Sequence, residues 1–276
     1  MRVVPVDLAA TRTHLRKAAT NLADLLGSAD RDRPVPGLEW NVGDVATHLV
    51  VAIESYRHMA GSTFDFTTLA PEVGEARTPG ERGAQISRAL LAQHSGRDLH
   101  ELADTLVQET DAYLDATGSV DQERWFPTWT GYPMDIAAAT AAMLGEQLIH
   151  GHDIARAIAR PWIIEPDAAR LVHAGTADLV PHYVAQDIPA HARLTIEIRI
   201  SGGPRFVVAI RDGVATIHPA GSLPRPECHL SGDPVTMLLA NYGRIGQLRP
   251  LLTGKVRAGG RRPWRARHLQ RYLTSI

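Results

Sequence analysis

Apolar residues recur along the chain with two different periods. Up to about residue 160 they are spaced by three and four positions, as on one face of an α-helix. Beyond residue 165 they alternate with polar residues over 194–200, 206–210 and 214–218, a period of two that is typical of β-strands. The pattern therefore predicts a helical domain over residues 1–160 and a small α+β domain over residues 165–276.

Polar capping residues indicate where the helices begin. Asp7 and Asn41 can each cap a helix, and Asp44, three residues after Asn41, completes an acidic variant of the capping box. In the first domain, helices are expected over residues 8–27, from 42 onward, over 81–116 with a break near 95–96, and over 132–158. In the second domain, helices are expected over 165–183, 233–242 and 264–273, with a hairpin turn at Asp212-Gly213 and a further strand over 228–230.

Two loops of the first domain have compositions that suit a substrate site. Residues 61–80 are rich in Gly, Pro and Thr and are expected to arch over one end of the bundle as a lid. The segment 125–129 is rich in aromatic residues. These could wall a pocket, although closing the end of a bundle is the more common role of such a loop.

Two polar residues interrupt the apolar stripe of the helix expected over 132–158. Glu146 and His150 lie four positions apart and therefore on the same face, which points to the core. Burying a carboxylate costs several kcal/mol unless it is compensated, and a divalent cation is the strongest compensator. His48 points inward from the second helix. Two histidines and a glutamate form a ligand set that zinc accepts in catalytic sites, whereas a buried histidine–glutamate pair without metal explains the pattern equally well.

Two motifs link these residues to a known family: Trp40-x-Val42-x-Asp44-Val45-x-x-His48-Leu49 and Glu146-Gln-Leu-Ile-His150-Gly-His152-Asp153. Together they resemble the mycothiol-dependent maleylpyruvate isomerase family. This resemblance implies a DinB-like four-helix bundle followed by a domain similar to sterol carrier protein type 2. It also implies that His48, Glu146 and His150 bind a divalent metal, usually zinc, and that mycothiol is the cosubstrate. His152 departs from the family pattern, which most often has tryptophan there. It could contact substrate or, as we expect, be an exposed turn residue.

The resemblance also suggests roles for two further residues. The stretch from Asp233-Pro234 through a helix to Gly243-Arg244 resembles the family pattern in which this arginine is implicated in activity. Arg244 is therefore expected to reach the metal cleft and bind a substrate carboxylate or a developing enolate through its planar guanidinium group. A cation favoured by the helix dipole at a helix C-terminus is the alternative. Asp153 could orient a metal ligand or recognise the thiol, or it could be a helix-surface carboxylate.

The chemistry expected of such a site is activation of an incoming thiol. A thiol bound to zinc loses its proton near neutral pH and attacks an electrophilic carbon. Because the chain is longer than a minimal isomerase needs, S-transfer in detoxification or biosynthesis is the preferred interpretation. Cis–trans isomerisation of maleylpyruvate is the second interpretation, and an apolar-ligand carrier without catalysis is the third. For the carrier, Ile196, Ile198, Val207 and Ile210 could line a tunnel, although a filled core is the default.

Composition narrows the classes of partner. The formal net charge of −1 gives no general attraction to nucleic acid or acidic membranes. The stretch from Asn241 onward is basic and contains no acidic residue, but a solvated helix face is the more common role of such a run. Cys228 is the only cysteine, so any further thiol must come from outside. The sequence shows no signal peptide and no stretch that could span a bilayer, so we expect a cytoplasmic protein without nucleic-acid or membrane partners. The sequence leaves the oligomeric state open.

Overall fold

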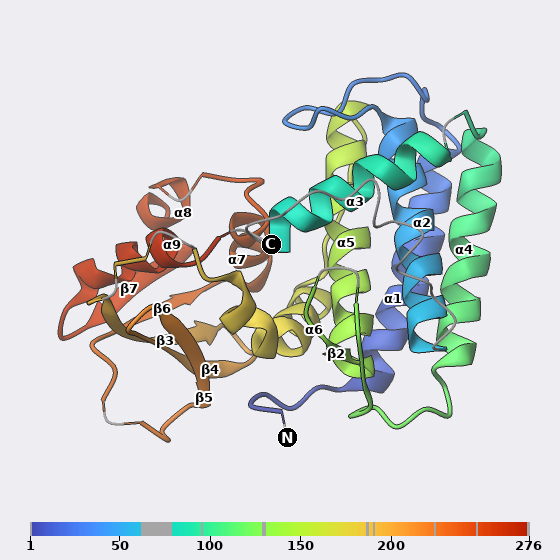
Figure 1. Ribbon diagram of the computed structural model, residues 1–276. Coiled ribbons are helices and arrows are strands. Elements are labelled where there is room, and N and C mark those ends of the chain that lie inside the picture. Colours follow the sequence, from blue (N-terminus) through green and yellow to red (C-terminus); the bar gives the residue numbers. More distant parts are fainter. Residues whose placement is uncertain are drawn as a thin grey trace. The chain divides into compact units, whose positions relative to one another are not determined.

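Figure 1 shows a computed structural model of the chain, which describes residues 2–61, 79–94, 96–128, 131–185, 188–189, 191–223, 225–246 and 248–274. The chain divides into two compact units. The helical unit lies within residues 7–164, and the sheet unit comprises the residues from Glu165 onward together with the first few residues of the chain. The first unit is dominated by helices and the second contains a sheet, which confirms the predicted fold class, α followed by α+β.

The helical unit is built from long helices. Its elements are α1 (Leu8–Leu26), α2 (Val42–Ala60), α3 (Pro79–Gln93), α4 (Leu99–Ala116), α5 (Ile136–Ala157) and two short paired strands, β1 (Trp125–Phe126) and β2 (Met134–Asp135). Both α1 and α2 pack against α4 and α5, and α3 runs obliquely across the bundle (Figure 1). The helices α1, α2, α4 and α5 therefore form a four-helix bundle.

The first two helices begin where their capping residues predict. Asp7 Oδ1 accepts a hydrogen bond from the backbone N–H of Ala10 at 2.9 Å. Asn41 Oδ1 accepts from the N–H of Asp44 at 2.8 Å, and Asp44 Oδ2 accepts from the N–H of Asn41 at 3.1 Å. This confirms the capping box. The capping box fixes the first turn of α2. Because the helix is regular, its first turn also sets the direction in which the later side chains point.

The later helices of the bundle differ slightly from the predicted ranges. The break expected near residues 95–96 is confirmed, because α3 ends at Gln93 and α4 begins at Leu99. The helix expected from residue 132 begins at Ile136 instead. The preceding Met134 and Asp135 pair with β1, and Asp135 Oδ1 accepts from the backbone N–H of Ala138 at 2.7 Å. Asp135 is thus an N-cap that the apolar pattern alone does not mark.

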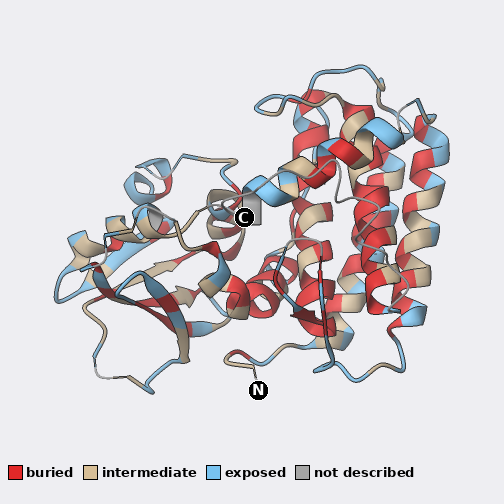
Figure 2. Ribbon diagram, in the orientation of Figure 1, coloured by how far each residue is buried: buried red, intermediate tan, exposed pale blue. Residues whose placement is uncertain are grey.

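The helix α5 is the most deeply buried of the bundle. Buried residues occupy nearly all of its sides, so that it is red over most of its length in Figure 2. In the core, the hydroxyl groups of Tyr113 on α4 and Thr140 on α5 lie 2.9 Å apart, within hydrogen-bond distance, so both buried polar groups are satisfied. Among the described residues, no helix has both the length and the apolar character needed to cross a bilayer.

Gly151 on α5 lies directly under the ring of Trp162. The indole N–H of Trp162 donates to the carbonyl oxygen of Leu148 at 3.0 Å, and a Cβ atom at Gly151 would overlap the indole ring. The indole ring covers α5 at Gly151, about one helical turn after Leu148, whose carbonyl oxygen accepts the hydrogen bond. A glycine at this helical position is therefore required by the close approach of an aromatic ring.

Replacing Gly151 with alanine is expected to destabilise the protein by about 1–3 kcal/mol. Displacing the ring costs about 1–3 kcal/mol in overpacking and about 1 kcal/mol for the lost hydrogen bond, which together exceed the gain of about 1 kcal/mol in helix propensity. Chemical denaturation measures the change. Gly27→Ala is the matched control, because a Cβ there meets its neighbours at 3.7 Å, an ordinary contact. A Gly151→Ala protein as stable as the wild type would contradict this account.

The sheet unit combines a five-stranded sheet with short helices. Its elements are α6 (Pro166–Thr176), the 3-10 helix η2 (Ala177–Tyr183), β3 (Arg193–Ile200), β4 (Arg205–Arg211), β5 (Val214–Pro219), β6 (Cys228–Gly232), α7 (Pro234–Asn241), α8 (Leu248–Leu252), β7 (Val256–Gly260), the 3-10 helix η3 (Pro263–His268) and α9 (Leu269–Tyr272). The strand order is β5-β4-β3-β6-β7. All neighbouring strands are antiparallel except β3 and β6, which are parallel.

The hairpin between β4 and β5 has the predicted turn. Asp212 and Gly213 have φ angles of 53° and 79°, the left-handed values that a two-residue type I′ turn requires at both positions. The strands at 194–200, 206–210 and 214–218 are confirmed, each with small extensions. The region 264–273 is mostly a 3-10 helix followed by one α-turn, rather than the continuous helix that was expected.

One face of the sheet is apolar and forms the core of this unit. Ile196 and Ile210 belong to that core, whereas Val207 pairs with Glu197 in the register of β3 and β4 and therefore lies on the opposite face. Ile198 lines a large cavity between the sheet and the helices. The expectation of a completely filled core is therefore wrong for this part of the unit.

Candidate metal centre

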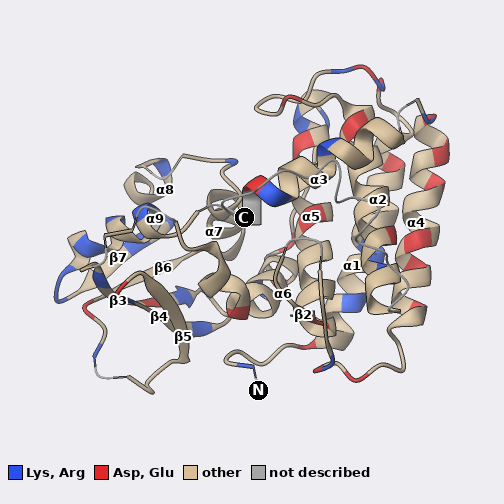
Figure 3. Ribbon diagram, viewed as in Figure 1, with Lys and Arg blue, Asp and Glu red and all other residues tan. Residues whose placement is uncertain are grey.

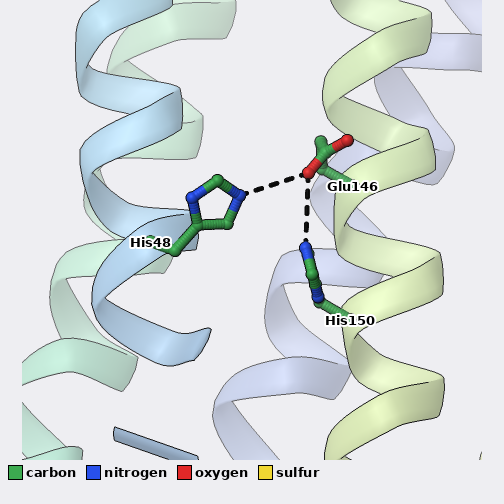
Figure 4. A group of neighbouring side chains, drawn as sticks. All are labelled: His48, Glu146 and His150. Carbon is green, nitrogen blue, oxygen red and sulfur yellow. Dashed lines mark hydrogen bonds and ion pairs between the residues drawn. The ribbon is translucent and has the colours of Figure 1, made fainter. Parts of the chain in front are cut away.

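Three side chains converge in the helical unit: His48 from α2, and Glu146 and His150 from α5 (Figure 4). The Nε2 atoms of His48 and His150 lie 3.3 Å and 3.4 Å from the same oxygen, Glu146 Oε2. Each residue offers one ligand atom, and these atoms lie within 4.8 Å of one another. The structure thus brings together all three residues that the sequence singled out as metal ligands.

Helix geometry explains why these residues meet. Glu146 and His150 are four residues apart on α5, so their side chains lie one above the other on one face. The helix α2 packs against α5, and His48 lies two turns after the capped start of α2 at Asn41. The start of α2 therefore sets the height at which His48 faces the pair on α5.

The cluster is partly open to solvent. About 25% of the Glu146 side chain is exposed, compared with 11% for His48 and 9% for His150. The sequence pattern predicts that Glu146 points into the core, and that is only partly correct. Glu146 is thus the most exposed of the three side chains.

The protonation states of the cluster suit metal ligands. Burial raises the pKa of Glu146, but hydrogen bonds to His150 and His48 outweigh burial and hold this pKa well below its usual range. Burial lowers the pKa of His48, and the neighbouring His150 lowers it further. At neutral pH the site therefore presents a carboxylate and at least one neutral imidazole, which are the forms that bind a cation.

The carboxylate of Asp153 lies beside His150, next to the ring nitrogen that does not face Glu146. Its Oδ2 atom lies 3.2 Å from His150 Nδ1, and its side chain is only 2% exposed. Burial lowers the pKa of His150, but the neighbouring carboxylates of Asp153 and Glu146 outweigh this effect and raise it. A carboxylate beside Nδ1 favours a proton on this nitrogen, and Nε2 is the ring nitrogen that faces Glu146. The alternative that Asp153 is a helix-surface carboxylate is therefore wrong.

Sequence reasoning gave no role to Trp40, which lies against both histidines. Its ring centroid is 5.1 Å from that of His48 and 6.3 Å from that of His150. The Trp40 side chain is partly exposed. It therefore forms an aromatic wall at the edge of the cluster, a role that its place in the first motif could have indicated.

A small cavity of about 10 Å³ borders His48. It is lined by His48 itself and by Val51, Ala52, Ser87, Leu90 and Leu91, the last three from α3. This volume holds about one water molecule. The helix α3 therefore contributes one hydroxyl group and an otherwise apolar surface to the surroundings of the cluster.

The structure also describes two further residues that the sequence singled out, Arg244 and His152. Arg244 follows α7 in the sheet unit, and its Nη1 atom donates to the carbonyl oxygen of Tyr242 at 2.7 Å. This contact at the end of a helix fits the alternative of a C-terminal cation. His152 is a half-buried residue of α5 rather than an exposed one. Most of the expected lid, residues 62–78, lies outside the described residues, as does Trp129 of the aromatic segment.

Comparison with known proteins identifies relatives of the chain. The family model described as "Mycothiol maleylpyruvate isomerase N-terminal domain" matches residues 12–155. A crystal structure of the mycothiol-dependent maleylpyruvate isomerase has 13% sequence identity and a TM-score of 0.51, with 92% of this chain and 93% of that chain covered. A histidine-to-alanine mutant of the enzyme covers the same shares at 14% identity and a TM-score of 0.51. No curated protein matches the chain significantly.

At these identities the solved structures show a shared fold that extends over both units. The family model spans more than half of the chain and contains all three residues of the cluster. The chain therefore belongs to the mycothiol maleylpyruvate isomerase family.

Proposed function

We propose that the chain is a metal-dependent enzyme that activates mycothiol at the cluster of His48, Glu146 and His150. The convergence of three ligand atoms within 4.8 Å of one another supports this proposal most strongly. Two imidazoles and one carboxylate form a ligand set of catalytic zinc sites, which leaves a coordination position for water or substrate. Zinc is accordingly the metal that we propose.

The residues around the cluster fit a resident cation. Asp153 occupies Nδ1 of His150 and so leaves Nε2 to point at the cluster, as in the carboxylate–histidine pairs that support metal ligands. Trp40 shields the two imidazole rings. When bound, a divalent cation lowers the pKa of a coordinated thiol and holds it as the nucleophilic thiolate near neutral pH.

The family relationship supports isomerisation of maleylpyruvate as the reaction. In this reaction the thiolate sulfur adds to one carbon of the cis double bond, and the electron pair of that bond moves to the conjugated carbonyl group as an enolate. Rotation about the resulting single bond and expulsion of the thiolate give the trans isomer. The thiol is regenerated, so no thiol is consumed in the net reaction.

S-transfer, which the sequence alone favoured, is less well supported. That preference rested on the length of the chain, but the match covers 92% of this chain and 93% of the isomerase chain, so the two chains have similar lengths. If the protein were a carrier without catalytic activity, the three ligand atoms that converge in the helical unit would have no function. Thiol-dependent isomerisation is therefore the function that we propose.

Incubating the purified protein with mycothiol and maleylpyruvate tests the proposal. We expect the trans isomer to accumulate while the amount of free thiol stays constant, as measured by NMR and by thiol titration. Chelation should abolish the reaction, and added zinc should restore it. A stable thiol adduct with loss of free thiol would show S-transfer instead. A reaction that persists unchanged in thoroughly demetallated protein would contradict the metal site.

Arg244 is proposed to bind a carboxylate of the substrate. Its planar guanidinium group can form two parallel hydrogen bonds with a carboxylate. Arg244→Ala is expected to reduce kcat/KM by about tenfold or more, because the substitution removes a charge-assisted contact with the substrate. Metal content should stay unchanged, because the three proposed metal ligands are still present. Steady-state kinetics and elemental analysis measure the two effects. Unchanged kinetics would leave Arg244 as a helix C-terminal cation only.

A further inference from the structure

The two histidines of the metal cluster have different surroundings. The Nε2 atom of His150 faces Glu146, and the Nδ1 atom of the same ring lies 3.2 Å from the carboxylate of Asp153. The Nε2 atom of His48 also faces Glu146, at 3.3 Å, and Nδ1 of this ring points away from that carboxylate (Figure 4). No residue within the described ranges forms a hydrogen bond with His48 Nδ1. Among these residues, a polar group therefore lies beside both nitrogens of His150 but beside only one nitrogen of His48.

A histidine that binds a metal needs a partner on its second nitrogen. A neutral imidazole carries one N–H group, so a ring that binds a cation through Nε2 has its proton on Nδ1. In metal sites this N–H is almost always donated to a carboxylate, a backbone carbonyl or a water molecule, which fixes the orientation of the ring. None of the described residues supplies such an acceptor to His48, and a water molecule would supply it.

The cavity that borders His48 has the size and the lining for one water molecule. Its volume of about 10 Å³ is that of a single molecule. Four of its lining side chains are apolar: Val51, Ala52, Leu90 and Leu91. The other two, His48 and Ser87, can form hydrogen bonds. A buried water requires two to four polar partners, and these two side chains meet that requirement.

Ser87 is a buried residue of α3 whose hydroxyl group needs a partner. Its relative exposure is 5%, and its hydroxyl forms no hydrogen bond with any residue that the structure describes. A hydroxyl inside a helix often donates to the carbonyl oxygen four residues earlier, as Thr47 does to Gly43 at 2.8 Å. Ser87 makes no such bond, and leaving a buried hydroxyl unsatisfied is destabilising. A water molecule in the cavity would satisfy Ser87 and His48 together.

The helix α3 brings a neutral group, not a charged one, to this cavity. Its charged residues, Glu81, Arg82 and Arg88, are exposed and do not line the cavity; Figure 3 shows the charged positions in red and blue. A hydroxyl and a water differ from a carboxylate because each can donate as well as accept. The water can therefore accept from Nδ1–H when Nε2 of His48 binds a cation, and donate to Nδ1 when Nε2–H donates to Glu146. His48 keeps a partner in both states.

We propose that Ser87 positions His48 through one water molecule in this cavity. The hydroxyl of Ser87 holds the water, and the water holds Nδ1 of His48, so that Nε2 stays directed at the other two ligands. Ser87 is thus a positioning residue that acts through His48. The effect of Ser87 on metal binding rests on the proposed metal-dependent function, whereas the water and its two contacts can be observed in the metal-free protein.

NMR of the metal-free, full-length protein with nitrogen-15 in its histidines tests the water bridge. We expect a nuclear Overhauser cross-peak between a bound water and the ring protons of His48. Ser87→Ala leaves that water with a single polar side chain, which is too few to hold it. The cross-peak should then disappear, and the Nδ1 resonance of His48 should move toward that of a nitrogen without a hydrogen bond. The resonances of His150 should stay in place.

Ser55→Ala is the matched control, because Ser55 is a serine of α2 that is 4% exposed and does not line the cavity. Its spectrum should show the water cross-peak and the wild-type position of the His48 Nδ1 resonance. Absence of the cross-peak from the wild type would overturn the proposal. So would a His48 resonance that stays in place in Ser87→Ala, or one that moves equally in both variants.

Metal affinity shows whether the water bridge matters for the metal centre. In competition with a chromophoric chelator, Ser87→Ala is expected to bind zinc about five- to tenfold more weakly than the wild type, because one hydrogen bond to a ligand is lost. Ser55→Ala should bind zinc as the wild type does. Equal affinity of Ser87→Ala and the wild type would overturn the positioning role. If no form bound zinc, the proposed metal-dependent function would fail, and the His48 resonance would still decide whether Ser87 holds the water.

Discussion

His150→Ala is expected to reduce bound metal from about one equivalent to a small fraction of that and to reduce thiol-dependent turnover by more than about a hundredfold. His150 supplies one of three donor atoms and is only 9% exposed. Residues that merely support metal ligands contribute about 10–100-fold to affinity, so loss of a ligand has the larger effect. Elemental analysis after dialysis and initial rates with maleylpyruvate and mycothiol measure the two quantities.

His152→Ala is the matched control for this variant. It removes an imidazole from the same helix, two residues away and outside the cluster. Its metal content should equal that of the wild type. If His150→Ala and His152→Ala lost the same amount of metal, or if neither lost any, the cluster would be a hydrogen-bonded buried group and not a metal centre.

Asp153→Asn is expected to weaken metal affinity by about 10–100-fold while the protein stays folded. Asparagine has nearly the same shape but lacks the charge that holds His150 Nδ1 at 3.2 Å, so the imidazole becomes a poorer and less well oriented ligand. Competition with a chromophoric chelator measures the affinity. The reduced charge also removes one cause of the raised pKa of His150.

The control for Asp153→Asn is the same substitution at an exposed aspartate. Asp104 lies on the exposed side of α4, and Asp104→Asn should leave metal affinity unchanged. Thermal denaturation of the metal-free forms shows whether Asp153→Asn alters folding by itself. Wild-type affinity in a folded Asp153→Asn protein would rule out a supporting role for this carboxylate and leave it as a structural acid.

The cluster of His48, Glu146 and His150 could be predicted in part, because helix geometry relates the spacing of residues in the sequence to their distance in space. Glu146 and His150 are four residues apart, and four residues make about one turn, so their side chains must be neighbours. His48 is 98 residues from Glu146. Periodicity shows that His48 points inward but not which residue it meets, and the motif around Trp40 supplied that information. The exposure of Glu146 depends on the packing of three helices and is not encoded in the spacing.

Other features could not be predicted from local patterns. The strand β7 has the sequence Val256-Arg-Ala-Gly-Gly260, in which charge and glycine hide the alternation of a strand. It forms because β6 offers an unpaired edge, which is a tertiary effect. The cavity beside Ile198 likewise depends on how far the C-terminal helices stand from the sheet. A pattern of apolar residues identifies the inward face but not whether the space in front of it is filled.

The helices α5 and α2 contribute different numbers of residues to the cluster. The span from Glu146 to Asp153 holds two donors and the supporting acid, so this half of the centre exists once α5 has formed. The third donor, on α2, must be brought in by closing a long loop of chain, which costs entropy. A cation bound by all three would act as a reversible cross-link between two distant helices. It would stabilise the bundle by about 2.7 kcal/mol when its free concentration is about a hundred times its dissociation constant, so resistance to heat would depend on metal supply.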